Sequence, residues 1–518
     1  MFLLLSLTGC SENIPPSTAT GSENESSETT EPVFESTEFS VLIYNVENIF
    51  DIDEVALFRD YKQALDTKSG YGPLQFRTKL LNLVEVIKTI DEGKGPDLIL
   101  FQEFEGDQTP NANLNVEEIR LDPDRPKVAD LLLGDVPESY RDLPAYVWTW
   151  MALDDAGLDY PYVVSSDYVP PPSADDGPVH ANATFSRFPI TSTQSHVLQK
   201  ARSILEATIQ IGEFQLTTFN NHWKSGASRQ DTEQIRVQNA GVLRSRLDEL
   251  LQADRYHDVI VGGDLNSHYN QNRIFPDWDQ TGVNDVLGSQ GVETGLFDQQ
   301  KADLYNLWFE LPLEERGSEL YRNTWGTLMQ ILLTPGLYDE HGIQYIDQSF
   351  KVVRIPDLNE NPVTGAPFRW MGVEEGTGYS DHFPLLARYR TVNGQKAKPM
   401  PLDNPSRSLA VPDTQTVVDL SLVDLSQAKA FSDYQTRNDF EQVSSLGQFV
   451  RLEGLVLNGD QLQIESQIGP IDLWIPNREF RNQFKADYET GEDVIVYGQV
   501  GWYRGNWQVV LSDPAWLK

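Results

Sequence analysis

Residues 41–48 read VLIYNVEN, an apolar run that ends in amide and carboxylate side chains. The same order of apolar and polar residues returns in LILFQE at 98–103, LTTFNNHWKS at 216–225 and VIVGGDLN at 259–266. In a last stretch, SDH at 380–382, the apolar run follows instead. Short apolar runs of this kind predict strands covered on both faces. Polar groups at the ends of strands that share one core would form a single site.

The polar groups in these stretches suit metal-assisted hydrolysis of a phosphodiester, which needs charge neutralisation on the phosphoryl oxygens. Carboxylate and amide oxygens are the ligands that Mg²⁺ and Mn²⁺ prefer, and Ca²⁺ also accepts them. Glu103 follows a buried strand and is the best predicted metal ligand. Asn45 shares that role or holds a phosphoryl oxygen, and Asp381 provides a second metal contact.

The remaining polar groups fit an activated water and a proton donor. Asp264 is placed to orient the attacking water, with Asn266 two residues further along. His382 can donate to the scissile phosphate or carry a proton near neutral pH. Each short motif by itself also fits an ordinary turn or a helix cap. Their joint occurrence at strand ends favours the catalytic interpretation.

The charge of the chain restricts its substrates. The 518 residues include 40 Lys and Arg and 78 Asp and Glu, for a formal net charge of −38. Such a surface repels polyanions, so it argues against non-specific nucleic-acid binding over the whole molecule. A polyanionic substrate must therefore be handled locally, through cations.

The single cysteine excludes internal disulfides and thiolate metal clusters. It lies in Leu7-Thr8-Gly9-Cys10, which matches the lipobox of bacterial lipoproteins, so residues 1–10 are predicted to be a lipoprotein signal with lipidation at Cys10. Residues 11–38 are rich in Ser, Thr and Glu and predict a disordered tether. We expect a bacterial cell-envelope address, on the outer membrane facing the periplasm or the cell surface. The lipid on Cys10 is the only membrane contact expected.

Two folded regions are predicted beyond the tether. Residues 39–392 alternate strand-like and helix-like segments and form the catalytic domain, with amphipathic helices expected over 74–90 and 227–251. Residues 393–415 carry four prolines and predict a linker. Residues 416–518 predict a second domain, in which three strands, a helix over 478–488 and two more strands follow one another. That order indicates a small OB-like β-barrel, although other small barrels give a similar pattern.

The motifs of residues 39–390 resemble those of the endonuclease/exonuclease/phosphatase superfamily, which includes deoxyribonuclease I. The resemblance implies a four-layer α/β/β/α sandwich, in which two packed mixed sheets are flanked by helices. It also implies phosphate contacts by His222, with Lys224 as a supporting cation and Asn182 as a further substrate-binding residue. Asn45, Glu103, Asp264, Asn266, Asp381 and His382 match the remaining motifs.

One position departs from the pattern of this family. Its members usually carry an Asp before an aliphatic strand, where it orients the terminal histidine. The corresponding stretch here is GTLMQILL at 326–333, with Met329 in the place of the carboxylate. Methionine is a weak hydrogen-bond acceptor. We therefore expect another group to orient His382, with Asp347 and Glu375 as candidates.

The motifs specify the reaction better than the substrate. The barrel favours nucleic acid, because OB-folds bind single strands through aromatic stacking and basic grooves. Trp474, Trp502, Tyr503 and Trp507 could offer ring faces there, or they could fill the barrel core. The prediction is a divalent-metal-dependent nuclease that hydrolyses DNA, or RNA, by direct attack of water. No obligate protein partner is implied. The alternatives are a phosphatase or phosphodiesterase for small or lipid phosphoesters, and a catalytically weak nucleic-acid-binding relative.

Overall fold

The computed structural model describes ten ranges of the chain, and by their contacts Ser36–Lys518 form one compact unit. The predicted lipidation site Cys10 and most of the predicted tether lie outside the described residues. None of the helices in the described ranges has the length and apolar character that crossing a bilayer requires. The described ranges are 34–53, 55–57, 72–109, 116–133, 136–173, 177–297, 304–402, 411–458, 461–503 and 505–518.

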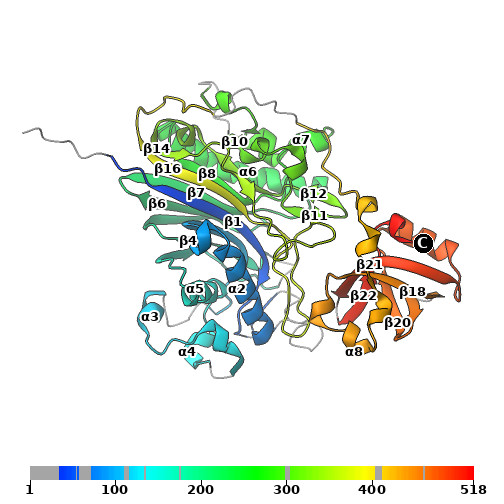
Figure 1. Cartoon of the computed structure of the whole chain (residues 1–518). Helices are drawn as coiled ribbons and strands as arrows, with labels where there is room; N and C mark the ends of the chain where they lie inside the picture. The colour runs from blue at the N-terminus through cyan, green and yellow to red at the C-terminus, as the bar shows by residue number, and fades with distance from the viewer. Residues whose placement is uncertain are drawn as a thin grey trace, which may run out of the picture. The chain divides into compact units, whose positions relative to one another are not determined.

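The first sheet is built around a strand from the start of the folded chain and a strand that comes much later. β1 (Glu38–Ile49) pairs antiparallel with β16 (Leu385–Asn393) and parallel with β2 (Leu98–Glu105). Figure 1 shows these segments side by side, β1 in blue and β16 in yellow. Its other strands are β14 (His341–Tyr345), β15 (Lys351–Val352), β4 (His180–Ser186) and β3 (Tyr162–Ser165).

The second sheet carries the other two central strands of the fold. β7 (Phe214–His222) pairs parallel with β8 (Val259–Asp264), and β8 pairs antiparallel with β13 (Met329–Leu333). The remaining strands are β5 (Ile190–His196), β6 (Ile204–Ile211), β10 (Leu304–Asn306) and β9 (Ser289–Gln290). A separate hairpin is formed by β11 (Glu319–Tyr321) and β12 (Thr324–Gly326).

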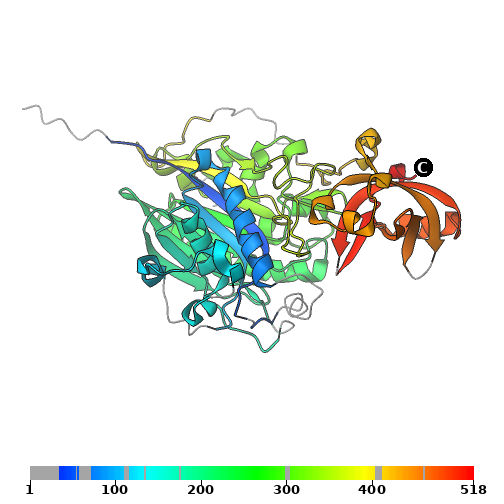
Figure 2. The same cartoon turned by 60° about the horizontal axis from the view of Figure 1, so that its bottom comes forward.

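Helices cover the outer faces of both sheets. α2 (Pro73–Lys88) and α5 (Ala145–Asp155) pack on the first sheet, and Figure 2 shows α2 lying across it. α6 (Gln230–Ala253) packs on the second sheet. α2 and α6 correspond to the two predicted amphipathic helices. Shorter helices are α3 (Val116–Leu121), α4 (Glu138–Arg141) and α7 (Gln271–Ile274).

The core explains why the central strands are apolar on both faces. Along β1, Leu42 and Tyr44 point into the layer under α2 and α5. Val41 and Ile43 point the other way and pack between the two sheets, against Ile260 of β8 and other residues of the second sheet. Side chains alternate along a strand, so a strand between two apolar layers needs an uninterrupted apolar run. The predicted four-layer α/β/β/α sandwich is confirmed.

The C-terminal region closes into a five-stranded barrel. Its strands follow the order β18, β19, β20, β22, β21, and β21 pairs back onto β18. All pairs in this ring are antiparallel except β20 with β22. The strands are β18 (Phe449–Asn458), β19 (Leu462–Ser466), β20 (Gly469–Trp474), β22 (Asn506–Val510) and β21 (Asp493–Tyr503), with β17 (Lys429–Ala430) beside β18.

In the chain, α9 (Arg478–Asp487) follows β20 and precedes β21, and α8 (Arg437–Phe440) precedes the barrel. The element order agrees with the predicted OB-like barrel. The barrel core also contains Val373, which comes from the segment before β16, in addition to residues of the barrel strands such as Val450 and Ile464. The C-terminal core therefore uses residues from both predicted domains.

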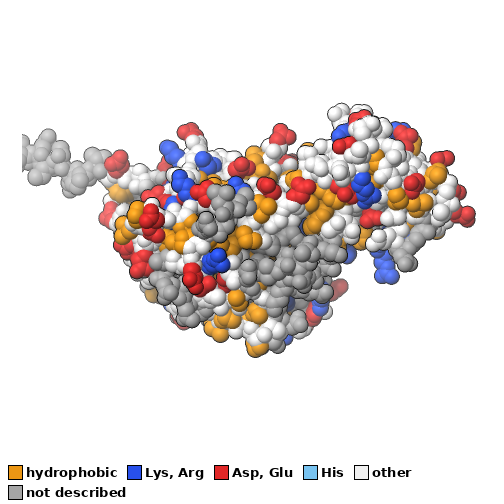
Figure 3. All heavy atoms as spheres, turned by 90° about the horizontal axis from the view of Figure 1, so that it is seen from below, with side chains coloured by type: hydrophobic (Ala, Val, Ile, Leu, Met, Phe, Trp, Pro, Cys, Tyr) orange, Lys and Arg blue, Asp and Glu red, His pale blue; other side chains and the backbone are white. Residues whose placement is uncertain are grey.

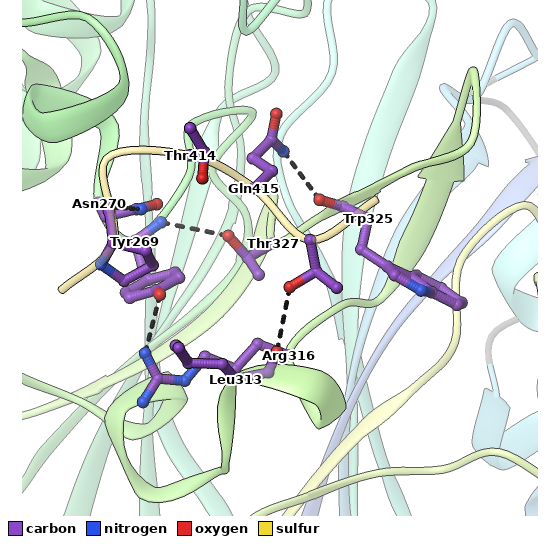
Figure 4. A pocket seen from close by; sticks show the side chains of 10 residues that line it. Tyr269, Asn270, Leu313, Arg316, Trp325, Thr327, Thr414 and Gln415 are labelled. Atoms are coloured by element: carbon purple, nitrogen blue, oxygen red, sulfur yellow. Dashed lines mark hydrogen bonds between the residues drawn. The ribbon is translucent and has the colours of Figure 1, made fainter. Parts of the chain in front are cut away.

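The end of the predicted linker packs against the catalytic region. Pro412, Thr414 and Gln415, with Thr416 after them, line a pocket of about 200 Å³ together with Tyr269, Arg316 and Trp325 (Figure 4). Within the pocket wall, Arg316 Nη1 donates to the Tyr269 hydroxyl at 2.8 Å. Gln415 Nε2 donates to the Trp325 carbonyl at 2.9 Å and Thr416 Oγ1 to the Leu313 carbonyl at 3.2 Å, and these two bonds connect the segment to its neighbours. The part of the predicted linker at 403–410 lies outside the described residues.

Candidate active site

The ends of four central strands meet at one edge of the two sheets. Asn45 is aligned with Gln102 in the first sheet, and His222 is aligned with Asp264 in the second. β1 runs parallel to β2, and β7 runs parallel to β8, so each pair brings two polar strand ends to the same edge. The two sheets are joined there by a bond from Gln102 Nε2 to Asn220 Oδ1, at 2.7 Å.

Asn45 connects two carboxylates from different sheets. Its Nδ2 donates to Glu103 Oε1 at 3.0 Å and to Asp264 Oδ2 at 3.1 Å, while its Oδ1 accepts from the Glu47 backbone N–H at 3.0 Å. The amide nitrogen, not the oxygen, therefore faces the carboxylates. In this arrangement Asn45 positions Glu103 and Asp264, and its role as a metal ligand stays a prediction.

The residues at this edge fit a hard divalent cation. Ligand atoms of Glu103, His222 and Asp264 all lie within 4.8 Å of one another. His222 Nε2 is 3.7 Å from Glu103 Oε1 and 3.6 Å from Asp264 Oδ2. Burial raises the pKa of Glu103, and the charge of Asp381 adds to that shift. A cation bound between the carboxylates would offset both effects, because it replaces lost solvation and cancels like-charge repulsion.

The same cluster sets the charge state of His222. Burial lowers the pKa of His222 well below its ordinary value, and the charges of Arg202, His180 and His382 lower it further. A neutral imidazole is the form that can coordinate a metal or accept a proton. His222 Nδ1 is buried without a hydrogen-bond partner among the described residues.

The backbone at this edge is unusual. Glu103, Asn48 and Asn266 have φ angles of 71°, 59° and 48°, in the left-handed region that side chains other than glycine rarely adopt. The register of β1 with β2, and of β2 with β4, shifts beside Glu103. Such irregularities redirect side chains at functional sites. The conformation brings both oxygens of Glu103 into use, since Oε2 accepts from the Asn48 N–H at 3.0 Å.

Gly263 is required directly before Asp264. Its φ is 130°, and a Cβ at this position would lie 2.1 Å from the Asn221 carbonyl oxygen. Only glycine allows β8 to approach β7 so closely at the strand end. This close approach of the two strands explains why a glycine precedes Asp264 in the motif.

Both neighbours in its motif bind His382. Its Nδ1–H donates to Asp381 Oδ1 at 2.8 Å, and its backbone N–H donates to Ser380 Oγ at 3.2 Å, which in turn donates to the Asn45 carbonyl at 2.7 Å. Burial alone lowers the pKa of His382, but the charges of Asp381, Asp264 and Glu319 outweigh it and hold this pKa well above its ordinary value. The imidazolium Nε2 lies 3.9 Å from Asp264 Oδ2. The two histidines of the site thus differ in charge.

The ring of His382 is bound by Asp381 and not by either predicted candidate, of which Glu375 is exposed. Met329 is buried and aligned with Asp264 in the β8–β13 pair. Asp347 lies elsewhere, in an acidic group with Glu293 and Glu310, and Asp381 takes the ring nitrogen instead.

A carboxylate that the sequence did not single out lies on the other side of His382. Glu319 of β11 is buried and accepts from the Leu328 N–H at 3.2 Å, while Ser318 next to it accepts from the Phe383 N–H at 2.7 Å. Burial raises the pKa of Glu319 to about 7, opposed by the charge of His382. β11 therefore supplies a charge that β13 lacks at Met329.

Three other predicted site residues occupy supporting positions. Asn266 donates from its backbone to Asp264 Oδ1 at 2.9 Å and from Nδ2 to the Trp223 carbonyl at 3.1 Å. Asn182 donates to the carbonyls of Ser203 and Asn220, at 3.0 and 3.2 Å. Burial and the neighbouring charge of Arg202 lower the pKa of Lys224. Substrate contacts by Asn182 and Lys224 stay predictions.

Arg202 is a site residue that no motif indicated. It is held by His180 Nδ1, which accepts from Nη2 at 3.2 Å, and by the Trp223 carbonyl, which accepts from Nη1 at 3.4 Å. Burial lowers the pKa of Arg202, while the charges of Glu103 and Asp264 raise it, so these groups are close neighbours. Arg202 Nε is buried without a hydrogen-bond partner among the described residues. It comes from the segment before β6, which carries no recognisable pattern.

A second polar network supports Asp381 and the end of β1. Arg369 Nε donates to Glu47 Oε1 at 2.9 Å, and Arg369 Nη2 lies 3.9 Å from Asp381 Oδ2. Lys79 of α2 is buried and donates to the carbonyls of Glu47 and Asn48. Burial lowers the pKa of Lys79 to about 8. These cations counterbalance the acidic groups of the site.

The surface of the molecule is not broadly basic. On the face drawn in Figure 3, Asp and Glu side chains are spread over the surface with Lys and Arg side chains singly between them. Arg187 pairs with Asp97 at 3.1 Å, and Arg229 pairs with Asp231. Local cations at the site, above all Arg202 and Lys224, are therefore better placed to meet an anionic substrate.

One family model matches part of the chain. Residues 183–390 match a model described as the Endonuclease/Exonuclease/phosphatase family. No curated protein matches the sequence. TDP2 from C. elegans is 12% identical, covering 68% of this chain and 75% of its own, with a TM-score of 0.35.

Two bacterial proteins of the endonuclease/exonuclease/phosphatase family are also similar in structure. The protein from Bacteroides thetaiotaomicron is 11% identical, with coverage of 69% of this chain and 96% of its own and a TM-score of 0.35. The protein from Leptotrichia buccalis C-1013-b is 12% identical, with coverage of 67% and 98% and a TM-score of 0.37.

Proposed function

We propose that this chain, whose residues 183–390 match the endonuclease/exonuclease/phosphatase family model, is a divalent-metal-dependent nuclease that hydrolyses DNA by attack of water. The observation that carries the proposal is the convergence of Glu103, His222 and Asp264, from three strands, within 4.8 Å. RNA is the alternative polymer. The chemistry common to both is hydrolysis of a phosphodiester bond.

Glu103 would hold the cation, with His222 and Asp264 within reach of the same ion. The bound cation supplies charge neutralisation on the phosphoryl oxygens. Asn45 keeps the two carboxylates in place through its amide nitrogen. Mg²⁺ or Mn²⁺ suits this set, because carboxylate oxygens dominate it and both ions retain water ligands.

Asp264 is the group best placed to accept a proton from the attacking water. Its Oδ2 faces Asn45, His222 and His382, while its Oδ1 is fixed by the Asn266 backbone. A carboxylate held in this way needs no reorientation when the reaction begins.

His382 is the proposed donor to the phosphoryl group. Asp381 fixes the ring through Nδ1, and Nε2 is buried without a hydrogen-bond partner among the described residues. A phosphoryl oxygen would provide the missing acceptor. Arg202 offers a second, permanent positive charge on the same side as Glu103 and Asp264.

Digestion of supercoiled plasmid, single-stranded DNA and RNA with Mg²⁺ or Mn²⁺ tests the proposal. We expect cleavage with either ion, no cleavage with EDTA, and recovery when the ion is added back. Bis-p-nitrophenyl phosphate and sphingomyelin belong in the same panel. Turnover of these small or lipid esters without cleavage of any polymer would contradict the nuclease proposal and favour a phosphodiesterase.

The proposed address is the bacterial cell envelope, through a lipid on Cys10. The support is the Leu7-Thr8-Gly9-Cys10 motif followed by a polar segment. Metabolic labelling with a palmitate analogue should mark the full chain and fail to mark Cys10→Ala. Equal labelling of both proteins would contradict lipidation at this residue.

A further inference from the structure

The barrel carries a surface pocket that the proposed hydrolysis does not use. It measures about 400 Å³ and is lined by residues of β19, β20, β22, α9 and the end of β21. In the pocket of Figure 4, Arg316 and Gln415 already bind neighbouring protein groups. The barrel pocket differs from it in two ways, which concern its aromatic rings and its charges.

Two aromatic side chains at the pocket are exposed. Trp474, the last residue of β20, is 44% exposed, and Tyr503, the last residue of β21, is 59% exposed. Trp507 instead lies in the barrel core, where it is 8% exposed, and Trp502 packs against that core. The structure thus separates the four predicted aromatics into two that support the barrel and two that face solvent at one pocket.

Two cations line the same pocket as these rings. Arg481 and Lys485 are one turn apart on α9, so they project from the same side of the helix. The Arg481 guanidinium lies over the Trp474 ring, 4.9 Å from its centroid, and donates to the Ile475 carbonyl at 3.3 Å. Neither cation forms an ion pair with a carboxylate in the described part of the chain.

The pocket also contains one carboxylate. Asp472 lines it, and its Oδ1 accepts from Gln463 Nε2 at 2.7 Å. Among the described residues that line it, the pocket therefore has two positive charges and one negative charge. The excess is positive, opposite in sign to the whole chain, so it favours an anionic ligand.

We propose that this pocket binds single-stranded nucleic acid, with a base stacked on Trp474 or Tyr503 and backbone phosphates on Arg481 and Lys485. Exposed rings offer faces to unpaired bases, and nearby cations neutralise phosphates. A duplex keeps its base faces inside the stack. A neutral oligosaccharide would also use the rings, but it gains nothing from two unpaired cations. Binding here requires no hydrolysis, so this proposal stands or falls independently of the catalytic one.

Fluorescence anisotropy with the full chain tests the proposal, using labelled dT12 in EDTA to prevent cleavage. We expect the wild type to bind dT12 more tightly than the corresponding duplex. Trp474→Ala and Tyr503→Ala should each weaken binding by about 5- to 100-fold, and Trp474→Phe should restore most of the loss. Lys485→Gln should reduce the slope of log K against log salt by about one.

Arg478→Gln provides the matched control, since Arg478 is exposed on the same helix and does not line the pocket. It should change the affinity less than twofold. Turnover of bis-p-nitrophenyl phosphate checks that the candidate active site of the sandwich is intact in each variant. Two results would overturn the proposal: equal dT12 affinity in wild type and both aromatic variants, or binding of maltoheptaose in preference to dT12. If the wild type binds dT12 but cleaves no DNA in Mg²⁺ or Mn²⁺, the nuclease proposal is contradicted and the binding proposal is not.

Discussion

The sandwich and the barrel treat charged side chains in opposite ways. The sandwich buries many of them, including Asp264 at the site and the Glu233–Arg236 pair on α6. Among the described residues from 411 onward, no charged side chain is buried, and Arg481 and Lys485 remain at the surface. Buried charge is costly unless partners surround it, whereas exposed charge remains available to a ligand. The difference indicates chemistry at the sandwich edge and reversible binding at the barrel.

The largest expected effect comes from Asp264, the most connected carboxylate of the site. Asp264→Asn should lower kcat/KM for DNA by roughly 10³-fold or more, because it removes the proton acceptor. Affinity of the same variant for dT12 in EDTA should be unchanged. Asp277→Asn, an exposed position outside the site, is the control. If Asp264→Asn lost both DNA hydrolysis and dT12 binding, the proposed division of roles between sandwich and barrel would be wrong.

Arg202 tests whether a local cation compensates for the acidic surface. Arg202→Gln should reduce kcat/KM for DNA by about 10- to 100-fold, the value of a charge-assisted hydrogen bond to phosphate. Arg229→Gln should have less than a threefold effect, because Arg229 already pairs with Asp231 at the surface. Steady-state kinetics of both variants give the comparison. If both variants lowered kcat/KM equally, the net charge of the protein, and not the position of Arg202, would determine the rate.

The buried ion pairs of the sandwich predict a dependence of stability on pH. Burial raises the pKa of Glu206, but hydrogen bonds from His196 and Arg246 outweigh it and lower this pKa to about 2. The carboxylate therefore stabilises the fold above its unfolded pKa of about 4.3, and the contribution is lost as pH falls towards 2.

Glu206→Gln should accordingly cost about 1–3 kcal/mol of unfolding free energy near pH 6 and progressively less below pH 4. Urea unfolding of both proteins at several pH values measures the difference. A difference that does not change with pH would show that the charge of Glu206 is not responsible. Glu479→Gln on the exposed face of α9 should show almost no difference at any pH.

The smallest expected effect is a rise in melting temperature on Mg²⁺ binding, which tests whether the cation binds in the sandwich. Mg²⁺ at roughly ten times its Kd should raise the melting temperature by roughly 1–4 °C, because it binds only the folded state. Glu103→Gln should remove this increase, and Trp474→Ala should retain it. An increase that persists in Glu103→Gln would place the cation elsewhere, for example at the acidic group of Glu293, Glu310 and Asp347.

Much of the fold was predictable because apolar periodicity is a local property. The uninterrupted run before Asn45 reflects a strand buried on both faces, and the order of the barrel elements along the chain follows from short alternating segments. The meeting of Asn45, Glu103, His222, Asp264 and His382 at one edge was also predictable, since each follows or precedes such a run, while their catalytic roles stay predictions. Arg202 and Glu319 were not, because a segment without a pattern and a short hairpin give no local signal.

The residues alone determined the layers and the strand ends and suggested the chemistry that we propose, because these depend on side-chain type and spacing along the chain. Only the tertiary structure decided which groups meet: that Asn45 turns its nitrogen to two carboxylates, and that Val373 joins the barrel core. It also decided that Trp474 faces solvent while Trp507 does not. Burial and partnership are properties of neighbours in space, which residues far apart in the chain supply.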